Sequence, residues 1–179
     1  MARHAALLRG INLVKHNRLK MADLRAAMQA LGFEDAETLL QSGNVVYTSS
    51  GAAAAEESAI RKQLAADAGL DVDVLVRTGR QLRAVVEHDP LREWVGEHRH
   101  YHVMFLSGKP AAAKLREIDA ERYLPERFAA HGREIYAWSP DGSYKAKLTH
   151  GFFEKRLGLR ATARNWNTVA RLAELTRTG

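Results

Sequence analysis

The sequence contains no cysteine among its 179 residues. This absence excludes disulfide bonds, thiolate metal sites and cysteine nucleophiles. The apolar run at residues 5–8 is too short for a signal peptide, and no segment approaches the roughly 20 apolar residues of a membrane-spanning helix. We therefore expect a soluble protein of the cytoplasm that has no membrane partner.

Aromatic residues are also few, at 7% of the chain, and the familiar catalytic signatures are missing. There is no phosphate-binding glycine loop, dinucleotide fingerprint, zinc-binding histidine–glutamate helix or nucleophile elbow. No expected strand carries the paired stacking aromatics of a ferredoxin-like RNA binder. The sequence therefore indicates neither a reaction nor a cofactor.

The positive charge of the chain is concentrated in two short segments. The net charge is +6 and the calculated pI is about 9.8. Residues 1–20 hold five basic residues and no acidic one, and residues 145–164 hold six basic residues and one acidic one. A localised excess of this kind indicates a surface that binds anions.

The first part of the chain has the pattern of a ferredoxin-like fold. Its expected elements are a strand at 5–8, a helix at 21–31, strands at 38–41 and 44–48 around a Ser42-Gly43 turn, a helix with Ile60, Leu64 and Ala68 on its buried face, and a strand at 72–76. Glu56 and Glu57 lie near the start of the second helix, where the helix dipole favours acids. The order β-α-β-β-α-β is typical of the ferredoxin-like arrangement.

The second part is also α+β, but its strand order cannot be read from the sequence. We expect helices at 80–88, 110–120, 150–157 and 165–176, and strands at 101–106 and 134–138. No internal sequence repeat is detectable. The predicted fold is α+β, with a ferredoxin-like subdomain at 1–78 and a second, smaller subdomain at 79–179 packed against it.

Three motifs near chain turns are candidates either for ligand binding or for local structure. Arg9, before Gly10 at a strand end, offers a planar fork of donors for carboxylate or phosphate, or pairs with a structural carboxylate. Residues 41–44, Gln-Ser-Gly-Asn, favour a local turn. Asn165 opens the last helix either as its N-cap or as part of an anion site flanked by Arg160 and Arg164.

Trp166 begins the buried stripe of that last helix, which Val169 and Leu172 continue. His98, His100 and His102 alternate, so on a strand their rings would share one face. They lack evident carboxylate or cysteine co-ligands, and we predict no metal site.

The motifs at 7–12 (Leu-Leu-Arg-Gly-Ile-Asn), 41–46, 76–78 and 161–169 occur in an order that resembles a bacterial family of uncharacterised proteins, domain-of-unknown-function family sixteen ninety-seven. Lys20-Met21 and Lys147-Leu148 extend the resemblance, which runs nearly end to end. It implies a two-part α+β fold with a ferredoxin-like first part and no established activity. The chain departs from the family at Val14-Lys15, where paired glycines are usual, and at Ala146, where serine is common.

The function predicted from these features is binding of an anionic, phosphorylated small ligand in a basic cleft. The predicted ligand-binding residues are Arg9, Asn12, Lys147, Arg164, Asn165 and Asn167. We expect folding to bring Arg9, Asn12, Lys147 and Arg164 to one cleft.

Three other interpretations stay open: an enzyme acting on a phosphorylated or nucleotide substrate, a nucleic-acid-binding protein, and an interaction domain whose basic rim only solubilises it. The two compact basic clusters favour a small ligand over nucleic acid. No cofactor is predicted, and a monomer is favoured.

Overall fold

The computed structural model describes residues 1–13 and 17–177. The chain forms two compact units, which are described separately. Unit 1 comprises Met1–Ala84 and the C-terminal segment from Leu172, and unit 2 comprises Val85–Arg171. The boundary expected from the sequence lies at 78/79, whereas these units divide within one helix at 84/85 and within another at 171/172. In the described part of the chain, no helix has the length and apolar character needed to cross a membrane.

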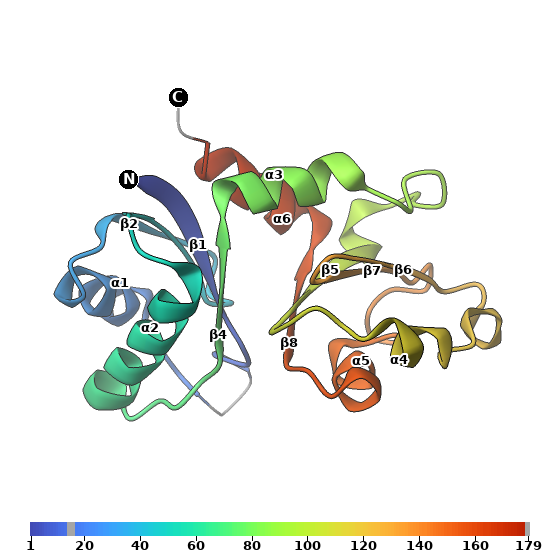
Figure 1. The fold of residues 1–179 in the computed structure, drawn as a ribbon, viewed down its shortest axis with the longest axis horizontal. Helices are drawn as coiled ribbons and strands as arrows, with labels where there is room; N and C mark the ends of the chain where they lie inside the picture. The colour runs from blue at the N-terminus through green and yellow to red at the C-terminus, as the bar shows by residue number, and fades with distance from the viewer. Residues whose placement is uncertain (14–16, 178–179) are drawn as a thin grey trace. The chain divides into compact units, whose positions relative to one another are not determined.

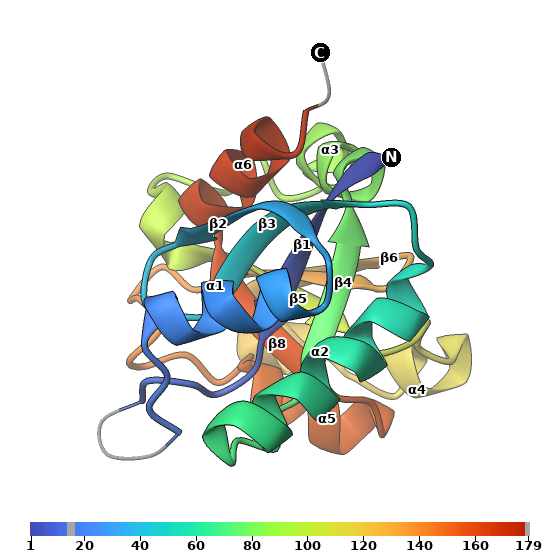
Figure 2. The same ribbon diagram turned by 90° about the vertical axis from the view of Figure 1, so that its left-hand side faces the viewer.

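Unit 1 contains the predicted ferredoxin-like fold. Its elements are β1 (Ala2–Leu8), α1 (Met21–Ala30), β2 (Glu34–Leu39), β3 (Asn44–Ser49), α2 (Ala53–Ala68) and β4 (Val74–Thr78). The strands form one antiparallel sheet in the order β2-β3-β1-β4. Figure 2 shows α1 and α2 on one face of this sheet. The helix α3 (Gly79–His88) follows β4.

The core of unit 1 lies between the sheet and these two helices. Leu24 and Met28 of α1 and Ile60 and Leu64 of α2 are fully buried, as their spacing predicts. Ala68, which was expected on the buried face of α2, is exposed at the end of the helix.

The two outer strands of this sheet differ from the sequence prediction. The strand expected at 38–41 is β2, which begins at Glu34 and has a register shift between Glu34 and Glu37. The strand expected at 72–76 is β4, which extends to Thr78. Every residue of β4 from Val74 to Arg77 is buried, so both faces of this strand are covered. Arg77 is therefore only 1% exposed.

Unit 2 repeats the topology of unit 1. Its elements are β5 (Tyr101–Leu106), α4 (Ala112–Arg116), β6 (Arg127–His131), β7 (Glu134–Trp138), α5 (His150–Leu157) and β8 (Ala161–Asn165), with α6 (Trp166–Leu175) after them (Figure 1). The sheet order is β6-β7-β5-β8, again antiparallel. The equivalence is structural, since the sequence shows no repeat.

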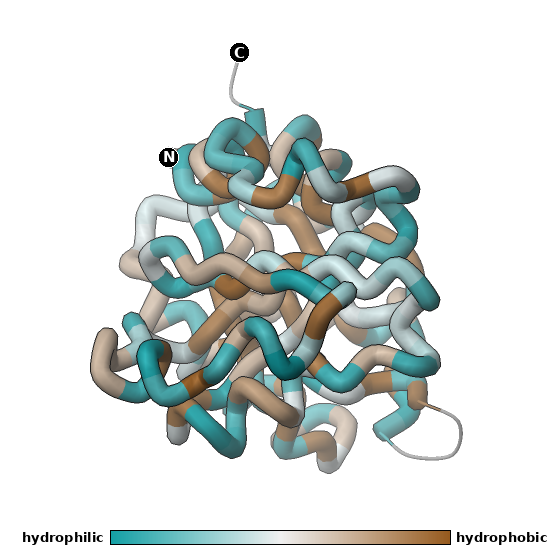
Figure 3. Tube along the Cα trace, turned by 90° about the vertical axis from the view of Figure 1, so that its right-hand side faces the viewer, coloured by the Kyte–Doolittle hydropathy of each residue, from teal (hydrophilic) through white to brown (hydrophobic). Residues whose placement is uncertain are grey.

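Two strands of unit 2 were missed in the sequence. β6 and β8 contain few large apolar residues, and β8 includes a buried arginine, so neither shows a strand pattern. The helix expected at 110–120 is only the short α4, followed by a 3₁₀ turn at Ala120–Tyr123. The sheet packs against Phe153 and Leu157 of α5. Figure 3 shows hydrophobic segments in the middle of this view, and most of the segments at its margin are hydrophilic, although some hydrophobic ones lie there too.

A buried carboxylate joins three elements of unit 1. Glu56, in the first turns of α2, is 3% exposed. Its Oε2 atom lies 2.7 Å from Nδ1 of His4 on β1 and accepts a hydrogen bond of 2.7 Å from the hydroxyl of Tyr47 on β3. Burial raises the pKa of Tyr47, and the hydrogen bond to Glu56 raises it further, so the phenol stays protonated and donates. From the sequence, Glu56 was expected only to interact favourably with the helix dipole at the start of α2.

The last helix packs as expected. Trp166, Val169 and Leu172 are all buried, and the Trp166 ring stacks on Tyr101 at 4.8 Å between ring centroids. We expect Trp166→Ala to lower the free energy of unfolding by about 3–5 kcal/mol, because the cavity left by a buried tryptophan is not refilled. Urea denaturation followed by circular dichroism measures this.

The control is Trp94→Ala. The Trp94 ring is half exposed and contacts the Arg127 guanidinium at 3.5 Å from its centroid. This change should cost no more than about 1 kcal/mol. Equal losses for the two tryptophans would contradict the packing described.

The variant Glu56→Ala should destabilise the protein by about 3–5 kcal/mol, because His4 and the Tyr47 hydroxyl would lose their buried partner. The matched control is Ser58→Ala, an exposed position on the same helix, which should change stability by less than about 0.5 kcal/mol. A Glu56→Ala protein as stable as the control would show that the buried carboxylate contributes nothing. Thermal and urea unfolding of both variants provide the measurement.

Stability should also fall at mildly acidic pH. Burial lowers the pKa of His88 and of His102 below the ordinary value of 6.5, and the nearby His131 ring lowers that of His88 further. The unfolded chain therefore binds more protons, so the stabilisation present above pH 6.5 is lost as the pH falls through the folded-state pKa values. The midpoint of urea unfolding should be lower at pH 5.5 than at pH 7.5, and His102→Gln should reduce that difference. An unchanged difference would contradict the assignment to His102.

Candidate functional site

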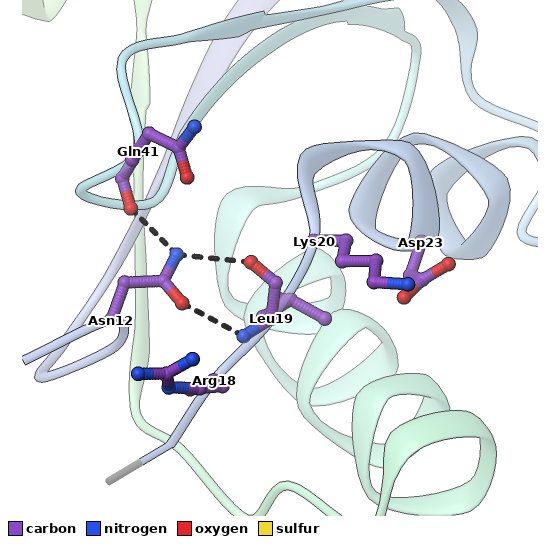
Figure 4. A pocket seen from close by; sticks show the side chains of 6 residues that line it. All are labelled: Asn12, Arg18, Leu19, Lys20, Asp23 and Gln41. Carbon is purple, nitrogen blue, oxygen red and sulfur yellow. Dashed lines mark hydrogen bonds between the residues drawn. The ribbon is translucent and has the colours of Figure 1, made fainter. Parts of the chain in front are cut away.

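Asn12 connects Leu19, just before α1, to the tip of the β2–β3 hairpin. Its Nδ2 donates to the carbonyl oxygens of Leu19 at 2.9 Å and Gln41 at 2.8 Å, and its Oδ1 accepts from the Leu19 amide at 2.9 Å (Figure 4). The residue has a φ of 55°, a left-handed conformation that asparagine tolerates. The amide that was predicted to orient a ligand thus fixes two pieces of backbone.

The tip of the β2–β3 hairpin is a turn held by side-chain hydrogen bonds, as the sequence predicted. Nδ2 of Asn44 donates to Leu39 O at 2.8 Å and to Ser42 Oγ at 3.0 Å. Gly43 has a φ of 83°, and a Cβ atom there would lie 2.8 Å from Cβ of Leu8. Only glycine fits this position, and the turn places Gln41 beside Asn12.

Residues of these two segments and the start of α1 line an open cavity of about 440 Å³ at the surface. It is lined by Asn12, Arg18, Leu19, Lys20, Asp23 and Gln41, all in unit 1 (Figure 4). Arg18, Lys20 and Asp23 are exposed. Three of the sequence motifs, at 7–12, 20–21 and 41–46, therefore contribute to one cavity.

The first turn of α1 opens at this cavity. Lys20 is the N-cap residue, and no side-chain cap hydrogen bond is present among the described residues. The Leu24 amide bonds to Lys20 O at 3.1 Å, as in any helix start. Amides of an uncapped first turn, together with the helix dipole, favour an anion.

Unit 1 has a second basic cavity of about 240 Å³ at the start of α3. It is lined by Ala2, Arg3, Thr78, Gly79, Arg80, Arg83 and Thr176. Thr78 and Gln81 form a reciprocal cap, with the Gln81 amide donating to Thr78 Oγ1 at 3.2 Å and the Thr78 amide to Gln81 Oε1 at 2.9 Å. Nε of Arg3 donates to Leu175 O at 3.0 Å. Sequence reasoning missed Arg80 and Arg83, which lie outside both basic segments.

In unit 2 the structure places Lys147 at the surface. Its backbone amide donates to the buried carboxylate of Glu126 at 2.9 Å, and the residue lines a cavity of about 130 Å³ that Lys145 and Glu126 also line. Asn165 is the N-cap residue of α6, as one interpretation of the sequence predicted, because its Oδ1 accepts a hydrogen bond from the Thr168 amide at 2.9 Å. Asn167 is exposed in the first turn of α6.

Arg164 is buried rather than displayed. It is 7% exposed, and its Nη1 donates to Thr162 Oγ1 at 2.8 Å and to Ala163 O at 2.9 Å. Burial lowers the pKa of its guanidinium to about 10. Arg77 is its counterpart on β4 and likewise donates from Nη1 to the preceding carbonyl, at 3.0 Å.

Arg9 lies half-buried at the end of β1, where its backbone amide donates to Asp73 O at 2.9 Å. Arg9 and Asn12 belong to unit 1, and Lys147, Arg164, Asn165 and Asn167 to unit 2. The single cleft expected from the sequence therefore stays a prediction. Val14 and Lys15, where the chain departs from the family pattern, lie outside the described residues.

The three alternating histidines do not share a strand. His98 and His100 lie in a 3₁₀ turn and only His102 lies on β5. Within residues 1–13 and 17–177, no group of three histidine or acidic side chains is placed to hold a metal ion.

Comparison with known proteins gives the fold and the family. The structure is similar to that of conserved bacterial protein SP0830 from Streptococcus pneumoniae, with a TM-score of 0.75 over 98% of this chain and 99% of that chain. At 21% sequence identity this likeness shows the fold alone. A search of the curated proteins finds no match. The model of the family described as "Protein of unknown function (DUF1697)" matches residues 1–136. That match covers three-quarters of the chain, which confirms the sequence-based resemblance, and the chain belongs to the DUF1697 family.

Proposed function

We propose that the protein binds a compact anionic ligand, a phosphorylated small molecule, in the cavity lined by Arg18, Lys20 and Gln41. The observation that supports this most is the Asn12 hydrogen-bond set, which holds Leu19, between Arg18 and Lys20, beside the uncapped start of α1. A ligand there meets two cationic side chains and the positive end of a helix, at a place where the backbone of Leu19 and Gln41 is hydrogen-bonded to Asn12.

The size and charge of this cavity favour a small ligand over a polymer. Its two cationic side chains gather at one loop instead of forming a stripe. Nucleic acid bound along several phosphates would need a longer basic track and stacking aromatics. The cytoplasmic location and the monomeric state favoured by the sequence stay predictions.

The alternative is an enzyme that acts on a phosphorylated or nucleotide substrate. Asp23 brings a carboxylate to the cavity, and a carboxylate can serve as a general base. No histidine and no hydroxyl side chain is among its lining residues as described, so the binding function is the simpler one. Direct ligand contacts were also predicted from the sequence for five residues outside this cavity. In this proposal those contacts are secondary to the contacts in the cavity; the five residues are Arg9, Lys147, Arg164, Asn165 and Asn167.

Inorganic pyrophosphate titrated calorimetrically into the protein tests the proposal. We expect Arg18→Ala and Lys20→Ala each to weaken binding about ten-fold, or ~1.4 kcal/mol. Asp23→Asn should tighten it roughly two- to five-fold, because a like charge is removed from the cavity. The matched control is Lys62→Ala, an exposed lysine on α2, which should leave the affinity unchanged.

Two results would overturn this assignment. If Arg80→Ala and Arg83→Ala weaken binding while Arg18→Ala does not, the anion occupies the arginine cavity at α3 instead. If a single-stranded oligonucleotide binds more tightly than pyrophosphate, with a steep loss of affinity on adding salt, the partner is nucleic acid.

A further inference from the structure

The shared topology of the two units makes their positions comparable one by one. On the central strand of unit 1, His4 pairs with Tyr47 of the neighbouring strand β3. On the central strand of unit 2, His102 pairs with Ala137 of the neighbouring strand β7. His4 and His102 are therefore counterparts, and so are Tyr47 and Ala137.

The opposite neighbours confirm this alignment. His4 pairs with Thr78 and His102 pairs with Asn165. Thr78 and Asn165 each end a strand and cap the helix that follows. Each side chain accepts a hydrogen bond from the backbone amide three residues later. The alignment therefore holds across three strands.

In unit 1 the Tyr47 ring fills the space beside the central strand. Tyr47 is fully buried, and its ring lies 5.9 Å from the His4 ring and 4.6 Å from the Phe33 ring, measured between centroids. Its hydroxyl donates to Glu56. A phenol group thus occupies this position of the fold, with its polar end in a hydrogen bond.

In unit 2 the corresponding space is open, because Ala137 has no ring. A cavity of about 330 Å³ lies there. Its apolar lining residues are Met104, Ala137, Ala146, Leu148 and Ala163, and its polar ones are His102, Ser139, Ser143, Thr149 and His150. Ser143 and His150 are exposed, so the cavity reaches the surface at their side.

Glu126 holds Ser139 and Leu148, two of the lining residues, in place. The buried carboxylate of Glu126 accepts hydrogen bonds from Ser139 Oγ at 3.0 Å and from the backbone amides of Lys147 and Leu148 at 2.9 and 3.1 Å. Thr149 then caps α5 by accepting from the Phe152 amide at 3.2 Å. The walls are therefore formed without a ligand, as in most small-molecule sites.

The polar groups of this cavity suit an uncharged ligand that donates a hydrogen bond. No lysine, arginine or acidic residue is among its described lining residues. His102 lines the cavity, and burial lowers the pKa of its ring below the ordinary value. A neutral imidazole has one acceptor nitrogen, which can receive a hydrogen bond from a ligand hydroxyl or N–H.

We propose that this cavity binds an uncharged aromatic molecule of phenol to indole size, whose hydroxyl or ring N–H donates to His102. The ligand would take the position that the Tyr47 side chain takes in unit 1. This site is separate from the anion cavity of unit 1 and does not depend on its assignment.

The test is a titration of the protein with phenol, followed by methyl NMR of the alanines. We expect saturable shifts of the Ala137 and Ala163 methyl signals, and affinity for phenol about five-fold higher than for toluene. In His102→Leu this preference for phenol should disappear. Absence of saturable shifts with both phenol and indole would overturn the proposal.

A substitution borrowed from unit 1 supplies the second arm. Ala137→Tyr should fill the cavity and abolish phenol binding in a folded protein, whereas Ala130→Tyr, at an exposed position of β6, should leave binding intact. If Ala137→Tyr does not fold, Ala163→Val narrows the same cavity and should weaken binding several-fold. Unchanged phenol binding in a folded Ala137→Tyr or Ala163→Val protein would show that the ligand lies elsewhere.

Discussion

The carboxylate of Glu56 is the contact on which unit 1 depends. It lies between the sheet and α2, and it connects the central strand through His4 and the neighbouring strand through Tyr47. Its other oxygen, Oε1, is buried without a hydrogen-bond partner among the described residues. Such a group is costly to bury, so the helix, both strands and their register must be in place together for it to be tolerated. The apolar core around it is not selective in this way.

Unit 2 builds the same topology with its carboxylate in a different place. Glu126 lies at the start of β6 and binds a loop through two backbone amides and one hydroxyl. A carboxylate with several donors is well satisfied, and it orders backbone that carries little apolar surface. In unit 1 the buried carboxylate of Glu56 therefore connects a helix to two strands. In unit 2 the carboxylate of Glu126 orders a loop beside a cavity.

The elements with strong periodicity could be predicted from the sequence. The spacing of Leu24 and Met28, and of Ile60 and Leu64, places each pair on one helix face, and both faces are buried. The strand β8 could not be predicted, because Arg164 is buried there and its neighbours are small. Glu56 has the sequence signature of an ordinary acid at a helix start, and its burial depends on partners 52 and 9 residues away.

Only the parts of the candidate site that form local sequence motifs could be predicted. Asn12 and the hairpin at 41–44 stand out as motifs, and the structure brings them together. Arg18 and Lys20 were recognised only as members of a basic segment, because nothing local shows that they line a cavity. Arg80 and Arg83 gave no signal, since they meet Arg3 only through the folding of distant segments. Side chains that converge from separate elements carry no spacing pattern that a single sequence can display.

The edge strand β2 has a consequence for how the protein behaves at high concentration. An open edge of a sheet offers unpaired backbone groups to another chain. On β2 this edge carries Glu34, Asp35 and Glu37, Asp35 has a φ of 49°, and the register with β3 shifts within the same four residues. A second molecule that approached here would meet like charges and a backbone that cannot continue a regular ladder. The β2 edge of the unit 1 sheet is thereby protected from edge-to-edge aggregation.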